Sequence, residues 1–258
     1  MTVTDILTPL RAQSPLVHCI TNYVAMNIAA NVVLAAGASP AMLHAVEEIT
    51  DFTPISGALT INIGTLSAPW VVGMISAAET ANTHNIPWVF DPVAHFVSNY
   101  RKGVAQDILS LRPTILRGNA SEILALAGEA GSGKGADSGD AVEAAEAVGV
   151  ALARKFGSVV AITGPVDLVT DGTRTARVAG GSEIMPQVTA LGCSLTALMG
   201  AYAAVGPAFD AALGALAHFK VAGGMAARQA SGPGSFQVHF LDALAAVQPD
   251  ELHEAVVA

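Results

Sequence analysis

Short apolar runs alternate with longer helical segments along most of this chain, and this alternation constrains the fold more than any other feature. The apolar runs lie at 16–20, 58–63, 87–90, 114–116 and 158–162, and they read as strands buried on both faces. Helical patterns lie between them, at 24–36, 47–52, 68–84, 102–110, 120–127 and 140–156. This order predicts an α/β fold with a doubly wound, mostly parallel sheet flanked by helices on both faces. Because no linker-like stretch divides the chain, we predict a single domain over residues 1–258.

The remaining segments complete this prediction. A short helix is expected at 4–12, and a further short apolar run lies at 39–43. The runs 167–170 and 175–178 read as a hairpin, because Asp171 and Gly172 between them supply a tight turn. From Cys193 onward the pattern is helical to the end of the chain, with breaks at 206–207 and 231–234.

Composition narrows the possible partners. The chain is 52% hydrophobic and only 13% charged, which predicts a large core and surface buried in an oligomer. Its net charge is −9 and no basic run is present, so nucleic acid is not an expected partner. The N-terminus lacks a signal-peptide pattern, and Asn27 and Asn31 interrupt the apolar stretch 24–36. We therefore expect a cytoplasmic protein without a membrane anchor.

Distinctive residues follow the predicted strands at the points where the strands end. In an open parallel sheet these positions meet at one rim, beyond the carboxyl ends of the strands, which is where ligands bind. The positions are Asn22, Met42, Asn62 with Gly64, Asp91, Arg117 with Asn119, and Thr163 with Gly164.

Two carboxylates on this rim suit a magnesium ion. Asp91 follows a strand directly, and Glu122 lies three residues after Asn119. Mg²⁺ is commonly held by one or two carboxylates and several waters. Asn119 and Glu122 also fit a capping box at a helix start, and both roles can hold together. Arg117 adds a guanidinium able to pair with phosphate oxygens.

Cys193 stands where a polar turn, residues 188–192, leads into a helix of small residues. Backbone N–H groups at a helix start favour anions, and they predict a thiol more acidic than usual. Such a thiol can be a base, a nucleophile or a neighbour of an anion site. The alternative is a buried cysteine that packs as a small hydrophobic residue.

The glycine-rich stretch Gly128–Gly135 matches the core of a phosphate loop, but we reject it as a nucleotide site. A phosphate loop needs a strand before it, a helix after it and a hydroxyl residue after the lysine. Here a helix precedes the stretch, and Gly135 follows Lys134. A flexible surface loop is the better interpretation.

Several motifs together make the chain resemble the hydroxyethylthiazole kinase family, over nearly its whole length. They are Ser14–Asn22, Gly37–Met42, Leu59–Leu66, Phe90–Val93, Arg117–Glu122, Ala161–Asp167 and Gly232–Phe236. The resemblance implies a ribokinase-like fold and ATP-dependent phosphorylation of 4-methyl-5-(2-hydroxyethyl)thiazole in thiamine biosynthesis or salvage. It also implies Mg²⁺ as a cofactor and a homotrimer whose sites lie between subunits.

The resemblance also assigns roles to individual residues. It implies ATP contacts for Arg117, Thr163, Asn119 and Gly164. It implies that Asp91 and Glu122 organise magnesium and phosphates. The substrate contacts that it implies are Met42, the backbone N–H of Ala190, and Asn22 close by. Cys193 takes the place of the catalytic aspartate of related sugar kinases.

This chain departs from the usual family pattern at two places. Ala190 and Leu191 stand where the family usually has glycine followed by a small residue, and Ala94 and His95 stand in a region that is usually rich in glycine. Two other functions stay open on the sequence alone. One is an ATP-dependent NAD(P)H-hydrate dehydratase-like lyase, and the other is a nucleotide-binding sensor without catalysis.

Overall fold

The structure, a computed structural model, describes residues 5–128 and 139–257. One sheet of nine strands runs through this part of the chain in the order β2-β1-β3-β4-β5-β6-β7-β8-β9. Neighbours from β2 to β6 are parallel, and those from β6 to β9 are antiparallel. The strands are β1 (Leu16–Ile20), β2 (Ser39–Ala41), β3 (Ala58–Asn62), β4 (Trp88–Asp91), β5 (Ile115–Asn119), β6 (Val159–Thr163), β7 (Asp167–Thr170), β8 (Thr175–Val178) and β9 (Val256–Val257).

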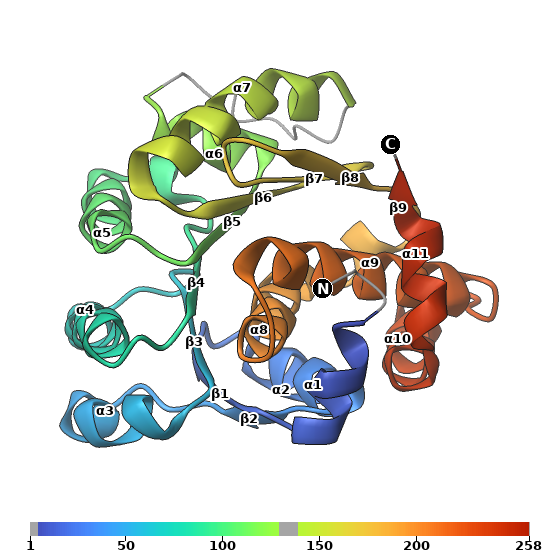
Figure 1. Cartoon of the computed structure of the whole chain (residues 1–258), viewed down its shortest axis with the longest axis horizontal. Helices are drawn as coiled ribbons and strands as arrows, with labels where there is room; N and C mark the ends of the chain where they lie inside the picture. Colours follow the sequence, from blue (N-terminus) through green and yellow to red (C-terminus); the bar gives the residue numbers. More distant parts are fainter. Residues whose placement is uncertain (1–4, 129–138, 258) are drawn as a thin grey trace.

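Helices cover both faces of the sheet (Figure 1). One face carries α1 (Leu7–Gln13), α2 (Met26–Ala36), α8 (Leu191–Ala203), α9 (Ala208–Ala227), α10 (Pro233–Ala246) and α11 (Leu252–Ala255). The other carries α3 (Val46–Phe52), α4 (Ala68–Thr83), α5 (Asn99–Ser110), α6 (Ala120–Leu126) and α7 (Gly139–Phe156). The strands serve both layers because successive side chains alternate: Val89 packs into the α8 layer, and Phe90 into the α4 layer. The predicted doubly wound fold is confirmed.

The chain reverses its direction of travel across the sheet at β1. From β1 it moves outward to the edge strand β2, and it then returns past β1 to β3. Such a switch point leaves a crevice at the carboxyl ends of the two flanking strands. We call the line formed by the carboxyl ends of β1 to β6 the rim.

Most element boundaries agree with the sequence prediction, and the differences occur near the rim and at the C-terminus. Strand β5 continues to Asn119, beyond the predicted end at 116, so Arg117 lies within a strand. Helix α8 begins at Leu191, two residues before Cys193. The predicted helical C-terminus is wrong at its end, because Val256 and Val257 pair with β8 as a short strand. The predicted hairpin is confirmed as β7 and β8.

No helix within residues 5–128 and 139–257 is both long enough and apolar enough to cross a membrane. Of the rejected phosphate loop, Gly128 belongs to the described part of the chain, and residues 129–135 lie outside it.

Candidate active site

A continuous line of hydrogen bonds crosses the rim, with one polar side chain from each of five strands. Asn22 follows β1, Asn62 ends β3, Asp91 ends β4, Arg117 lies in β5, and Thr163 ends β6. Helix α8, which covers one face of the sheet, adds Cys193 and Thr196. We call these seven residues the rim cluster.

Asp91 is the centre of the rim cluster and is fully buried. Its Oδ2 atom accepts hydrogen bonds from Thr196 Oγ1 at 2.6 Å, Asn62 Nδ2 at 2.9 Å and Arg117 Nη1 at 3.2 Å. Its Oδ1 atom has no hydrogen-bond partner in the described part of the chain. Burial raises the pKa of Asp91 to about 6, the guanidinium of Arg117 lowers it, and the charge of Glu122 raises it.

Arg117 is held at both ends of its guanidinium group. Nη1 donates to Asp91, and Nη2 donates to Thr163 Oγ1 at 2.8 Å. Burial lowers the pKa of Arg117, but the charges of Asp91 and Glu122 outweigh it, and the net shift is upward. A Cβ atom at Gly192 would lie 3.0 Å from Nη2, so this glycine allows the start of α8 to approach the guanidinium. The guanidinium therefore lies beside the N-terminus of α8. The positive charge and the helix N-terminus together favour an anion at this place.

Glu122 and Asn119 form the predicted capping box at the start of α6. Glu122 N donates to Asn119 Oδ1 at 2.9 Å, and Asn119 N donates to Glu122 Oε2 at 2.8 Å. The second oxygen, Oε1, accepts from the backbone N–H of Ala94 at 2.9 Å. Glu122 is 7% exposed. Two backbone N–H groups, of Asn119 and Ala94, therefore hold a carboxylate that is largely shielded from solvent.

Cys193 is the third residue of α8, and it faces the β1 end of the rim. Asn22 Nδ2 donates to its sulfur at 3.4 Å and to Asn62 Oδ1 at 2.8 Å. Burial raises the pKa of the thiol, Asp91 raises it further, and Arg117 opposes them. The expectation of a more acidic thiol is therefore wrong in direction, because desolvation outweighs the favourable charges.

The two positions that depart from the family pattern keep a backbone conformation that favours glycine. Ala190, the N-cap of α8, has φ 61°, and Ala94 after β4 has φ 47°. Both are left-handed conformations that cost an L-residue roughly 1–2 kcal/mol. Both turns therefore keep the left-handed conformation with alanine in place of glycine.

The other predicted substrate contact and the turn after β6 also lie along the rim. Met42 directly follows β2, is half-buried and packs against the α8-side core. Gly164 N donates to Asp167 Oδ1 at 2.8 Å, and Gly164 O accepts from Lys220 Nζ at 2.9 Å. Lys220 holds this turn from α9.

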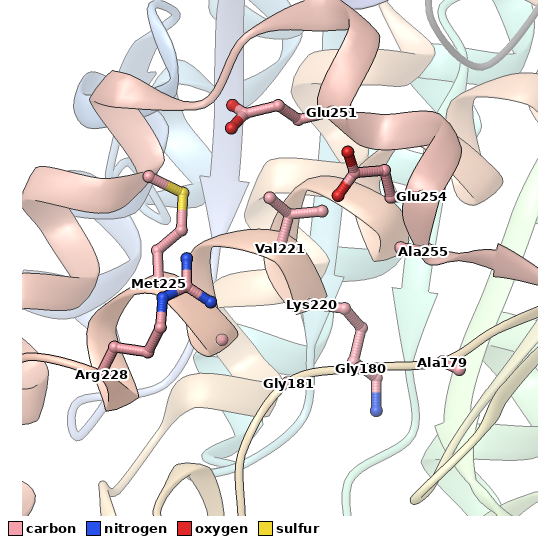
Figure 2. Close-up of a pocket in the computed structure, with 11 residues that line it drawn as sticks. Ala179, Gly180, Gly181, Lys220, Val221, Met225, Arg228, Glu251, Glu254 and Ala255 are labelled. Carbon is pink, nitrogen blue, oxygen red and sulfur yellow. The ribbon is translucent and has the colours of Figure 1, made fainter.

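Lys220 also lines a cavity of about 270 Å³ between α9, α11 and the loop after β8. Figure 2 shows Glu251 and Glu254 on one side of it and Met225 and Arg228 on another. None of the residues that line this cavity belongs to the rim cluster.

Two residues with clear roles in this geometry were not predicted from the sequence. Thr196 lies three residues after Cys193, on the same side of α8, and this spacing was the available signal. Arg101 lies in the first turn of α5, and no sequence pattern indicated that its side chain would turn back to the rim.

Comparison with known proteins gives the family. A sequence model of the hydroxyethylthiazole kinase family matches residues 7–250. The chain belongs to the hydroxyethylthiazole kinase family. A hydroxyethylthiazole kinase of Roseobacter denitrificans is 73% identical, with 98% of both chains covered. One of Gemmatimonas aurantiaca is 62% identical over 96% of this chain and 90% of its own length.

Solved structures agree with this assignment. A hydroxyethylthiazole kinase protein from Pyrococcus horikoshii superposes with a TM-score of 0.92 at 39% identity, with 99% of this chain and 97% of that chain covered. A ribokinase-like superfamily protein from Enterococcus faecalis has a TM-score of 0.70 at 12% identity, over 95% of each chain. At this identity the second likeness shows the fold alone. It is the ribokinase-like fold that the resemblance of the sequence implied.

Proposed function

We propose that this chain transfers the γ-phosphoryl group of ATP to the hydroxyl of 4-methyl-5-(2-hydroxyethyl)thiazole, giving its phosphate and ADP in thiamine biosynthesis or salvage. The observation that carries the proposal is the rim cluster, in which a buried Asp91–Arg117 pair adjoins the N-terminus of α8. Family membership supplies the substrate class.

ATP contacts are assigned to the β5 and β6 end of the rim. Arg117 presents positive charge beside the free N–H groups of α8, and such donors stabilise charge that develops on a transferred phosphoryl group. Thr163 orients the guanidinium, while Asn119 and Gly164 provide backbone close by.

Asp91 and Glu122 are the residues that would hold Mg²⁺. The buried and unpartnered Oδ1 of Asp91 supports this fit, since a hard cation prefers oxygen ligands. In the described segments no group of three or more His, Cys, Asp or Glu side chains could hold a metal. Mg²⁺ commonly uses one or two carboxylates with water and substrate phosphates. Bound there, Mg²⁺ supplies charge beside the phosphates.

The thiazole alcohol is assigned to the β1 and β2 end, near Met42, Asn22 and the backbone N–H of Ala190. Cys193 then takes the proton of the hydroxyl as its oxygen attacks phosphorus. Burial raises the pKa of this thiol, and this upward shift limits what the base contributes. Most of the rate comes from positioning and electrostatics, which makes a covalent phosphocysteine unnecessary.

A homotrimer with sites between subunits is part of this proposal. Exposed apolar side chains beside the rim support it: Tyr23 is 67% exposed and Val24 is 58% exposed, directly after Asn22. Mass measurement in solution tests it. A monomer that is fully active at nanomolar protein would contradict sites built between subunits.

The proposed reaction is tested by a coupled ADP-release assay with the thiazole alcohol, pyrimidine alcohols and sugars in parallel. We expect ADP release with the thiazole alcohol in preference to the others. ATP binding without ADP release would favour the sensor, and ATP-dependent turnover of hydrated nicotinamide nucleotides alone would favour the lyase.

A further inference from the structure

Arg101 makes an unusual set of contacts for a residue that is not part of the rim cluster. Its guanidinium donates to four backbone carbonyls: Nη2 to Ile63 O and Val93 O at 2.6 Å each, Nη1 to Gly64 O at 3.2 Å, and Nε to Ala94 O at 3.3 Å. Two of these carbonyls follow β3 and two follow β4. One side chain thus joins two neighbouring strand ends.

The joined segments lie on either side of Asp91, whose carboxylate the rim cluster surrounds. On the β3 side, Gly64 N donates to Asn62 Oδ1, and Asn62 in turn donates to Asp91. On the β4 side, Ala94 N donates to Glu122 Oε1. The loop that Arg101 holds is therefore the loop that fixes the Glu122 carboxylate.

Ala94 needs such support because its backbone is strained. Its φ of 47° is left-handed, a conformation that alanine disfavours because its Cβ approaches the following carbonyl oxygen. Arg101 holds its carbonyl and Glu122 accepts its N–H, so both neighbouring peptide groups are held. Arg101 itself is held in place at the start of α5, where its N–H donates to the N-cap Ser98 at 3.2 Å.

We propose that Arg101 is a positioning residue for the reaction: it keeps Ala94 in the left-handed conformation that aims the Ala94 N–H at the Glu122 carboxylate. The expected change in kcat rests on the proposed function, whereas the geometric role of Arg101 does not. Because glycine adopts a left-handed conformation readily, glycine at position 94 should reduce the need for Arg101.

The experiment combines hydrogen exchange with kinetics on R101A, R101K, the double variant R101A/A94G, and K102A. Lys102 is an exposed neighbour on α5, so K102A controls for the loss of one positive charge. Exchange of the segment 92–97 is followed by mass spectrometry on ligand-free protein. We expect exchange at Ala94 to accelerate in R101A by roughly five- to thirty-fold, the population change that 1–2 kcal/mol of strain produces.

We expect kcat of R101A to fall by a similar factor, with a smaller fall in R101K, and R101A/A94G to recover part of both losses. K102A should match wild type. If R101A does not fold, R101K carries the same comparison, because lysine keeps the charge but cannot reach four carbonyls at once.

Unchanged exchange in R101A and R101K would overturn the proposal. The proposal would also be overturned if R101A/A94G showed the same loss of kcat and the same faster exchange as R101A. The hydrogen bonds of Arg101 would then act through something other than the Ala94 conformation. If wild type itself releases no ADP, the proposed function fails, whereas the exchange measurement still decides the role of Arg101.

Discussion

Replacing Ala190 by glycine should stabilise the protein, although the same replacement usually destabilises a helical protein. Ala190 is the N-cap of α8, with φ 61° and ψ 11°. The left-handed conformation costs alanine roughly 1–2 kcal/mol, and glycine avoids this cost. Glycine loses more backbone entropy on folding, about 0.5–1 kcal/mol. Subtracting the low ends and the high ends of these two ranges leaves a gain of about 0.5–1 kcal/mol for Ala190→Gly.

The assay is thermal unfolding at one fixed protein concentration, because oligomer formation makes the midpoint concentration-dependent. For a chain of this length the gain corresponds to a rise in Tm of about 1–4 °C. Ala151→Gly is the matched control. Ala151 is exposed inside α7, where glycine should cost about 0.8–1 kcal/mol.

The two variants should therefore shift the unfolding midpoint in opposite directions. An Ala190→Gly variant that loses as much stability as Ala151→Gly would refute the reasoning. In that case the left-handed conformation at the start of α8 would carry no strain that glycine could release.

Two further predictions concern the chemistry of the site, and a third concerns the pH dependence of stability. The double variant D91N/E122Q should lose magnesium-dependent turnover but keep its fold, as checked by ADP release and circular dichroism; unchanged magnesium dependence would exclude these ligands. C193D should keep substantial activity, whereas C193A and C193S should lose much of it and retain a remainder from Arg117 and the helix N-terminus, so an alanine variant as fast as wild type would leave the thiol merely structural. Burial raises the pKa of Asp167 to about 6, against the pull of its ion pair with Lys220, so the folded protein binds a proton that the unfolded chain releases near pH 4. The free energy of unfolding should fall by roughly 2 kcal/mol from pH 4 to 6 for this group, and D167N should lose that part of the slope in urea titrations.

The sequence by itself determined the α/β architecture and most members of the rim cluster. Alternating apolar runs and helical patterns are local features, and they suffice for the succession of strands and helices along the chain and for the two covered faces. Asn22, Asp91, Arg117 and Thr163 were found because parallel strands bring their carboxyl ends to one edge of a sheet. The capping box of Glu122 was found because it depends on a spacing of three residues.

Tertiary structure decided what these residues do to one another. Thr196 donates to Asp91 across 105 residues of sequence, and the side chain of Arg101 turns back to two strand ends. The pKa of Cys193 moves opposite to the local expectation, because burial in the assembled fold outweighs the helix start. Desolvation, and hydrogen bonds between distant segments, depend on which elements pack together, and no local pattern in the sequence encodes that packing.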